Sequence, residues 1–290
     1  ERINWTERVF IPTGDGGIAT FTRITASKPV VDLIEKNQSK SGAETEQGYG
    51  IPGIAAEEVL KAGPGDDSTV KIKKEEQERL YEQIAERVER QMDSLVVPST
   101  PTLYLESKGI PVQPGVLTDA DGKKTYIPAQ DADGKVWTMQ YIREDGAKRF
   151  SKDSRTEGCF HAIGGMDELA KAPVIVIAEG YATAGSLSEA LGFSTVAAFD
   201  SGNLPPVAEA LHGKFTDKPI VIAGDNDVHL ERSQGVNPGR TKAKEAANAV
   251  GGKAMFPIFA PGEQAENPKA FSDFNDLATK SVLGKDGLER

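Results

Sequence analysis

The sequence predicts an α/β protein whose carboxyl-terminal half carries a parallel, Rossmann-like sheet. Two apolar runs of strand length, 174–178 and 220–223, enclose a segment with helical periodicity. Strand-like and helix-like segments then alternate to residue 259, and such alternation is typical of a parallel sheet with helices on both faces. Between residues 103 and 165 the signals are β-like and divided by turns. They predict a smaller α+β subdomain ahead of the sheet.

Composition narrows the class of protein. The chain has 290 residues, of which 38% are hydrophobic and 27% charged, values typical of globular proteins. No apolar stretch approaches the roughly 18 residues that span a bilayer and no signal peptide is visible, so we expect a cytoplasmic protein without membrane contact. Cys159 is the only cysteine, which excludes an intramolecular disulfide and a cysteine-based zinc finger. The net charge of −10 argues against a generally basic nucleic-acid binder but permits a local basic groove.

A first region covers residues 1–98. It contains a β-like run from Val9 to Thr22 and a polar stretch from Asn37 to Gly50. From Lys74 to Leu95, apolar residues recur at intervals near 3.6, which predicts an amphipathic helix that buries one face. The sequence indicates no function for this region. Because the chain opens on Glu1 rather than methionine, we expect it to be a fragment of a longer protein.

A second region, residues 99–170, contains a predicted hairpin and a basic segment. The runs Tyr126–Gln130 and Val136–Ile142 flank a turn at 131–134. Residues 148–155 then hold four basic residues against one acid, a local charge of +3 in an acidic chain. Such a cluster suits phosphate binding, and it equally suits a solvated turn. Both interpretations stay open on the residues alone.

The third region, residues 171–290, has the most regular pattern. We predict strands at Val174–Ala178, Thr195–Phe199, Ile220–Ala223 and Ala254–Phe259. Helices are predicted at Tyr181–Leu191, near Pro206–Leu211 and at Thr241–Val250, with a loop leading to Gly239. This order places the ends of neighbouring strands at one edge of the sheet.

Acidic residues follow these strands. Glu179 comes directly after the first strand, and Asp225 and Asp227 come after the third. Carboxylates gathered at one edge repel one another unless a divalent cation binds among them, and oxygen-only ligands favour Mg²⁺ or Mn²⁺. Each motif also has a simpler interpretation, because Glu-Gly and Asp-Asn-Asp occur in turns and an aspartate such as Asp273 caps helices. The ordered combination favours a metal site.

That ordered set resembles the TOPRIM domain, which bacterial-type primases, type IA and II topoisomerases and some nucleases share. Glu179-Gly180 and Asp225-Asn226-Asp227 match its glutamate and Asp-x-Asp motifs. The similarity to the bacterial replicative primase core extends upstream through Tyr104–Ile110, Tyr126–Lys135 and Lys148–Phe150, and downstream through Phe259–Glu263 with Ser272–Asp276. It covers about Pro101 to Gly284 and is closest to primase modules of plasmid and conjugative-element proteins. The chain departs from the family in an insert, 228–238, between Asp227 and Gly239.

The resemblance implies a DNA primase catalytic core: a TOPRIM domain preceded by a primase-core subdomain, making short RNA primers on single-stranded DNA in plasmid replication or conjugative transfer. It implies Mg²⁺ (or Mn²⁺) held by Glu179, Asp225, Asp227, Asp273 and Asp276, with Glu179 as the alternative general base. Template and nucleoside triphosphates would be held by Lys108, Lys148, Arg149, Lys152 and Arg155. Other domains of a larger parent, a relaxase or helicase, are implied partners. A non-catalytic TOPRIM module that binds nucleic acid or a partner protein, and a TOPRIM nuclease, stay as alternatives.

Overall fold

The computed structural model describes residues 6–12, 18–24 and 67–288, with side chains from residue 73. The chain divides into two compact units, 1–66 and 67–290. In the first unit, β1 (Thr6–Pro12) and β2 (Ile18–Ile24) pair as an antiparallel hairpin, in agreement with the β-like run predicted over 9–22. The polar stretch 37–50 lies outside the described residues.

The second unit opens with a long helix, α3 (Asp67–Met92). Its residues Ile84 and Val88 are buried and pack with Tyr126 and Met139 of the following sheet. The predicted amphipathic helix is thus confirmed, because one apolar face is buried while most other described side chains are exposed. This packing joins α3 to the sheet that follows it in the chain.

A four-stranded antiparallel sheet follows, in the order β3 (Leu117–Thr118), β4 (Thr125–Gln130), β5 (Val136–Ile142) and β6 (Lys148–Phe150). The hairpin predicted from the turn at 131–134 is confirmed as β4 and β5. The β-like interpretation of the segment before it is wrong at one point. Residues 103–107 form a short helix, α4 (Leu103–Ser107), because Thr102 accepts a hydrogen bond from the backbone nitrogen of Leu105 and caps it.

The second sheet has five strands in the order β11-β10-β8-β9-β7. Strands β8 (Ile175–Ala178), β9 (Val196–Ala197), β10 (Ile220–Ala223) and β11 (Lys253–Met255) run parallel, and β7 (His161–Ala162) is antiparallel to β9. The predicted parallel sheet is confirmed, although β9 and β11 are shorter than expected. Paired hydrogen bonds of 2.8 Å between Gln130 and Phe160 connect the two sheets.

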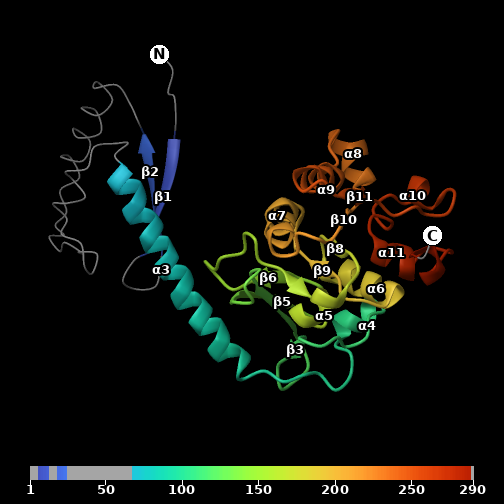
Figure 1. The fold of residues 1–290 in the computed structure, drawn as a ribbon, viewed down its shortest axis with the longest axis horizontal. Helices are drawn as coiled ribbons and strands as arrows, with labels where there is room; N and C mark the ends of the chain where they lie inside the picture. Colours follow the sequence, from blue (N-terminus) through green and yellow to red (C-terminus); the bar gives the residue numbers. More distant parts are fainter. Residues whose placement is uncertain (1–5, 13–17, 25–66, 289–290) are drawn as a thin grey trace, which may run out of the picture. The chain divides into compact units, whose positions relative to one another are not determined.

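Helices cover both faces of the parallel sheet (Figure 1). Ile175 and Ile177 of β8 pack in one cluster with α7 (Leu204–Lys214) and α9 (Pro238–Ala249). Val176 and Ala178 point the other way, into a cluster with α6 (Tyr181–Leu191) and α11 (Phe274–Thr279). Successive residues of a strand face opposite sides, so a strand buried on both faces is apolar throughout.

Shorter elements complete the described chain. They are α5 (Met166–Lys171), the 3₁₀ turns η1 (Ser201–Asn203) and η2 (Lys285–Leu288), α8 (Val228–Gln234) and α10 (Glu263–Glu266). The presence of α8 corrects the loop predicted before Gly239. This helix begins because the backbone nitrogens of Leu230 and Glu231 both donate to the carbonyl oxygen of Asp227. Within the described residues, no helix combines the length and apolar character needed to cross a bilayer.

Candidate functional site

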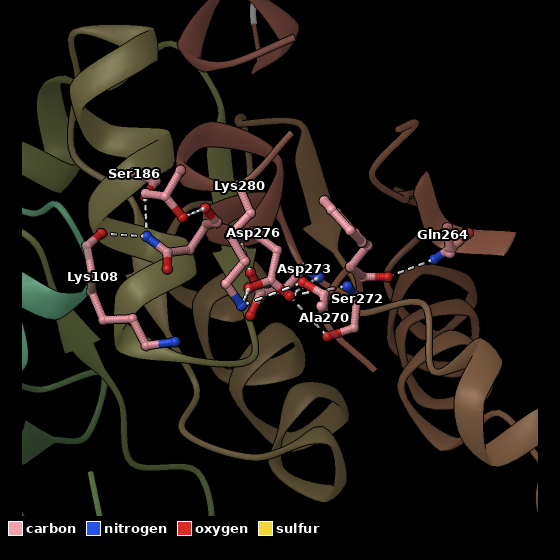
Figure 2. Close-up of polar contacts among 11 residues, drawn as sticks. Lys108, Ser186, Gln264, Ala270, Ser272, Asp273, Asp276 and Lys280 are labelled. Atoms are coloured by element: carbon pink, nitrogen blue, oxygen red, sulfur yellow. Dashed lines mark hydrogen bonds and ion pairs between the residues drawn. The ribbon is translucent and has the colours of Figure 1, made fainter. Parts of the chain in front are cut away.

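The predicted acids meet at the carboxyl edge of the parallel sheet. Strands β8 and β10 are neighbours, and Ala178 pairs with Ala223 at their ends. Glu179 therefore leaves the sheet beside the Asp225–Asp227 turn, as adjacent parallel strands require. Asp273 and Asp276 lie at the start of α11, and Figure 2 shows their polar contacts.

Burial and repulsion by neighbouring acids raise the pKa values of Glu179 and Asp225. Burial, followed by repulsion from Asp227 and Asp200, raises the pKa of Glu179 to about 7, while the charge of Lys148 opposes the rise. Burial also raises the pKa of Asp225 well above its usual range, followed by repulsion from Glu179 and Asp273. The edge is thus a site where negative charge is costly.

Asp225 carries the clearest signal for a cation. Its Oδ1 atom is buried and receives no hydrogen bond from any residue of the described chain. A desolvated carboxylate oxygen without a donor costs free energy that a bound cation would offset. The surrounding acids offer oxygen ligands, which fit Mg²⁺ or Mn²⁺. In chemistry, therefore, the residues fit a hard divalent cation.

Their spacing is looser than a coordination shell. Across residues 73–288, no three Asp, Glu, His or Cys side chains are close enough to hold one ion together. The acids repel one another electrostatically, but their oxygen atoms do not converge on one position. Metal binding at this edge would need side-chain rotations that bring the oxygens together.

The two carboxyl-terminal acids form a capping box at the start of α11 (Figure 2). Oδ1 of Asp273 accepts a 2.7 Å hydrogen bond from the backbone nitrogen of Asp276. Oδ2 of Asp276 accepts hydrogen bonds from the backbone and hydroxyl of Ser272, and its Oδ1 lies 2.5 Å from Nζ of Lys280. The helix-cap interpretation of this pair is confirmed. Both oxygens of Asp276 already have partners, whereas burial and the charge of Asp276 raise the pKa of Asp273.

Asn275 connects this helix to the upstream subdomain, and the sequence analysis missed it. Its side chain is fully buried, and Nδ2 donates to the carbonyl oxygen of Lys108 at 2.7 Å and to Oγ of Ser186 at 2.9 Å (Figure 2). The chain end of α4 is therefore fastened to α6 and α11. The charge of Lys108 opposes the rise in the pKa of Asp273, so Lys108 lies near that acid. Nothing in the local sequence signals this contact.

The basic segment divides into two groups. Lys148 lies near the acids. Burial and the charge of Lys108 lower its pKa, and the charges of Asp273, Asp225 and Glu179 oppose this shift. Lys148 as a whole is exposed, and its amine lies 5.8 Å from the ring centre of Tyr104. Arg149 and Lys152 are exposed, and Arg155 stacks 4.7 Å from the ring of Trp137. The structure thus brings Lys108 and Lys148 to the acids.

Asp200 is a further acid that the sequence analysis did not select. It follows β9, the neighbour of β8 on the side away from β10, and its charge raises the pKa of Glu179. Asp200 directly follows the predicted strand Thr195–Phe199, which is the same signal that selected Glu179, but no motif was assigned to it.

Comparisons with known proteins agree with this geometry. Residues 174–282 match the Toprim domain. Two proteins from Escherichia coli, each named DNA primase TraC, are 52% and 65% identical to the chain over 82% and 74% of its length. The chain belongs to the Toprim-domain primase family. It spans 28% and 19% of the lengths of these two relatives.

Two solved structures are similar to part of this chain. The catalytic domain of the primase DnaG, in a structure bound to single-stranded DNA, is 15% identical and aligns over 74% of this chain and 80% of its own, with a TM-score of 0.44. The zinc-binding and RNA polymerase domains of the Aquifex aeolicus primase are 21% identical over 68% of this chain and 43% of theirs, with a TM-score of 0.39.

Proposed function

We propose that this chain is a primase catalytic core that joins nucleoside triphosphates into short RNA primers on a single-stranded DNA template. The observation that carries the proposal is the Toprim edge itself. There, the buried and unpartnered Oδ1 of Asp225 lies in a cluster of acids that faces Lys148. Nucleotidyl transfer needs this combination, because acids hold the metal while cations hold the phosphates.

Each group has a role in this proposal. Asp225, Asp227 and Asp273 hold Mg²⁺ or Mn²⁺, with Asp276 completing the set or orienting Asp273 through the capping box. The bound metal would supply charge neutralisation at the triphosphate and a lowered pKa for the attacking hydroxyl. Glu179, with a pKa of about 7, is suited either to ligate the metal or to accept a proton near neutral pH.

The basic residues form two groups, one that contacts the triphosphate and one that contacts the template. Lys108 and Lys148, which lie near the acids, contact the triphosphate. Arg149, Lys152 and Arg155 contact the template backbone, since lysine and arginine contacts dominate affinity for polyanions. Because the TraC relatives are much longer than this chain, we assign template selection to other domains of a parent protein, a relaxase or helicase in plasmid replication or conjugative transfer.

The test is direct. The chain is incubated with single-stranded templates of mixed sequence, Mg²⁺ and labelled ribonucleoside triphosphates, and the products are separated on a denaturing gel. New labelled oligomers that disappear with EDTA or in Asp225→Asn are expected. Cleaved template without oligomers would replace the proposal with a nuclease. Bound but unchanged template would replace it with a non-catalytic nucleic-acid-binding module.

A further inference from the structure

The turn between β9 and α7, residues 199–203, contacts the strand that opens the basic segment and the chain that follows the segment. It begins with Phe199, whose φ of 75° is uncommon for a residue with a side chain. Such conformations persist where the surroundings enforce them, and they concentrate at functional sites. The contacts of this turn indicate what that function is.

Asn203 contacts the chain just beyond the basic segment, at Gly158 and Cys159. Its side chain is 6% exposed, and every contact is short: Nδ2 donates to the carbonyl oxygens of Cys159 and Ala198 at 2.8 Å each, and Oδ1 accepts from the backbone nitrogen of Gly158 at 2.8 Å. A fully satisfied buried amide of this kind specifies one arrangement of the groups around it. It ties the chain that follows Arg155 to the end of β9.

Phe199 contacts the strand that opens the basic segment. Its ring packs edge-to-face against Phe150, with ring centres 5.2 Å apart and an interplanar angle of 85°. Phe150 ends β6, the strand that carries Lys148 and Arg149. The next residue in the turn, Asp200, influences Glu179 electrostatically. One turn therefore contacts the basic strand on one side and reaches the acid edge on the other.

We propose that Phe199 and Asn203 are positioning residues, which hold the basic segment 148–155 beside the acid edge so that it binds nucleic-acid phosphates. This inference rests on the proposed function in one respect, the binding of nucleic acid by the basic segment. It explains why the left-handed conformation is occupied by phenylalanine rather than glycine. Glycine would adopt this φ without strain but would provide no ring for Phe150.

The experiment uses Phe199→Gly, which keeps the backbone conformation accessible and removes only the ring. Binding of a fluorescent oligo-deoxythymidylate is measured by anisotropy between 50 and 200 mM salt, in wild type, in Phe199→Gly and in the reference variant Lys148→Ala/Arg149→Ala. We expect Phe199→Gly to weaken binding several-fold. We also expect the slope of log affinity against log salt to fall by roughly 0.7 for each phosphate that the segment no longer binds. Asn203→Asp keeps the acceptor for Gly158 but loses the two donated hydrogen bonds, so it should also weaken binding and lower the salt slope.

Two controls separate positioning from general damage. Phe259→Ala breaks a similar edge-to-face pair, with Phe271 at 5.3 Å, without contact to the basic segment, and its salt slope should match wild type. Adding Phe199→Gly to Lys148→Ala/Arg149→Ala should cost less affinity than adding it to wild type, because two of the four cations that the turn positions are already gone.

The outcomes divide clearly. An unchanged salt slope in Phe199→Gly with a smaller fraction of binding-competent protein means that the turn only supports folding, and this overturns the inference. Full additivity with Lys148→Ala/Arg149→Ala overturns it as well. If the reference variant binds DNA like wild type, the strand that Phe199 holds through Phe150 contacts no phosphate and the inference falls, while primer synthesis still decides the proposed function.

Discussion

The backbone nitrogen of Gly239 donates a 2.9 Å hydrogen bond to Oδ2 of Asp227. The first turn of α9 therefore packs directly on the Asp-Asn-Asp motif. Asn237 reinforces this contact, because its Oδ1 accepts from the backbone nitrogen of Asp227 at 3.0 Å. The insert 228–238 thus forms α8 and the start of α9, and Gly239, the residue after it, contacts Asp227. The insert separates Gly239 from Asp227 in the sequence, and the start of α9 brings the glycine back to the motif.

This contact predicts that position 239 tolerates only glycine. A side-chain carbon there would lie 2.8 Å from the carbonyl oxygen of Asp225 and 2.9 Å from Oδ2 of Asp227. We expect Gly239→Ala to lower the free energy of unfolding in urea by about 1–3 kcal/mol, as overpacking does, and to weaken metal binding. Gly213→Ala in α7 is the matched control, since an added carbon meets nothing within 4 Å. Equal stability of the two variants would contradict the prediction.

Metal binding at the sheet edge is a second prediction. We expect Mn²⁺ titrated calorimetrically into the chain to give a saturable heat that Asp225→Ala/Asp227→Ala abolishes. The reason is that Oδ1 of Asp225 is buried without a hydrogen-bond donor and the carboxylate of Asp227 lies close to it. Asp121→Ala/Asp217→Ala removes the same charge from exposed positions and should leave the heat unchanged. Identical heats in wild type and in the Asp225/Asp227 variant would show that the acids bind no metal.

The raised pKa of Glu179 predicts how the stability of the metal-free protein depends on pH. Its folded pKa of about 7 exceeds the ordinary glutamate value of 4.5, so the folded state binds more protons between these values. Stability should therefore fall as pH rises from about 4.5 to 7, by up to roughly 1–3 kcal/mol for this group. Glu179→Gln should flatten this slope in urea melts with EDTA. A variant whose pH profile overlays wild type would place the titration elsewhere.

A fourth prediction separates Lys148 from its neighbour Arg149. Lys148 opposes the charge of Glu179, Asp225 and Asp273. Arg149 is the next residue of β6 and therefore points to the other side of the strand. Removing the Lys148 charge should therefore strengthen Mn²⁺ binding roughly two- to tenfold, or about 0.4–1.4 kcal/mol, because its repulsion of the cation is removed. Arg149→Ala serves as the control and should leave the Mn²⁺ affinity unchanged. Equal affinities in wild type and Lys148→Ala would mean that the amine lies away from the metal.

Much of the carboxyl-terminal fold could be predicted from local pattern. Strands β8 and β10 are buried on both faces, so they appear in the sequence as unbroken apolar runs. The acids that follow them had to emerge at one edge because neighbouring parallel strands end together. The short strand β9 was harder to bound. Phe199 looks like its last residue, but its positive φ takes it out of the strand.

The helix α8 shows why other elements were missed. None of its side chains is buried, so it has no apolar face and leaves no period of 3.6 in the sequence. The helix α4 is only five residues long, too short for a periodic signal. Hydrophobic periodicity reflects burial, and elements that bury little leave no such pattern.

The sequence therefore established the parallel sheet, the acids at its edge and the presence of a basic segment, because each depends on residues next to one another in the chain. The arrangement of the site depends on contacts between distant residues. Asn275 meets the carbonyl oxygen of Lys108 across 167 positions, and Asn203 meets the backbone nitrogen of Gly158 across 45. A hydrogen bond between such residues follows from how packed elements come together. It leaves no periodic trace in either segment, so it is visible only once the chain is folded.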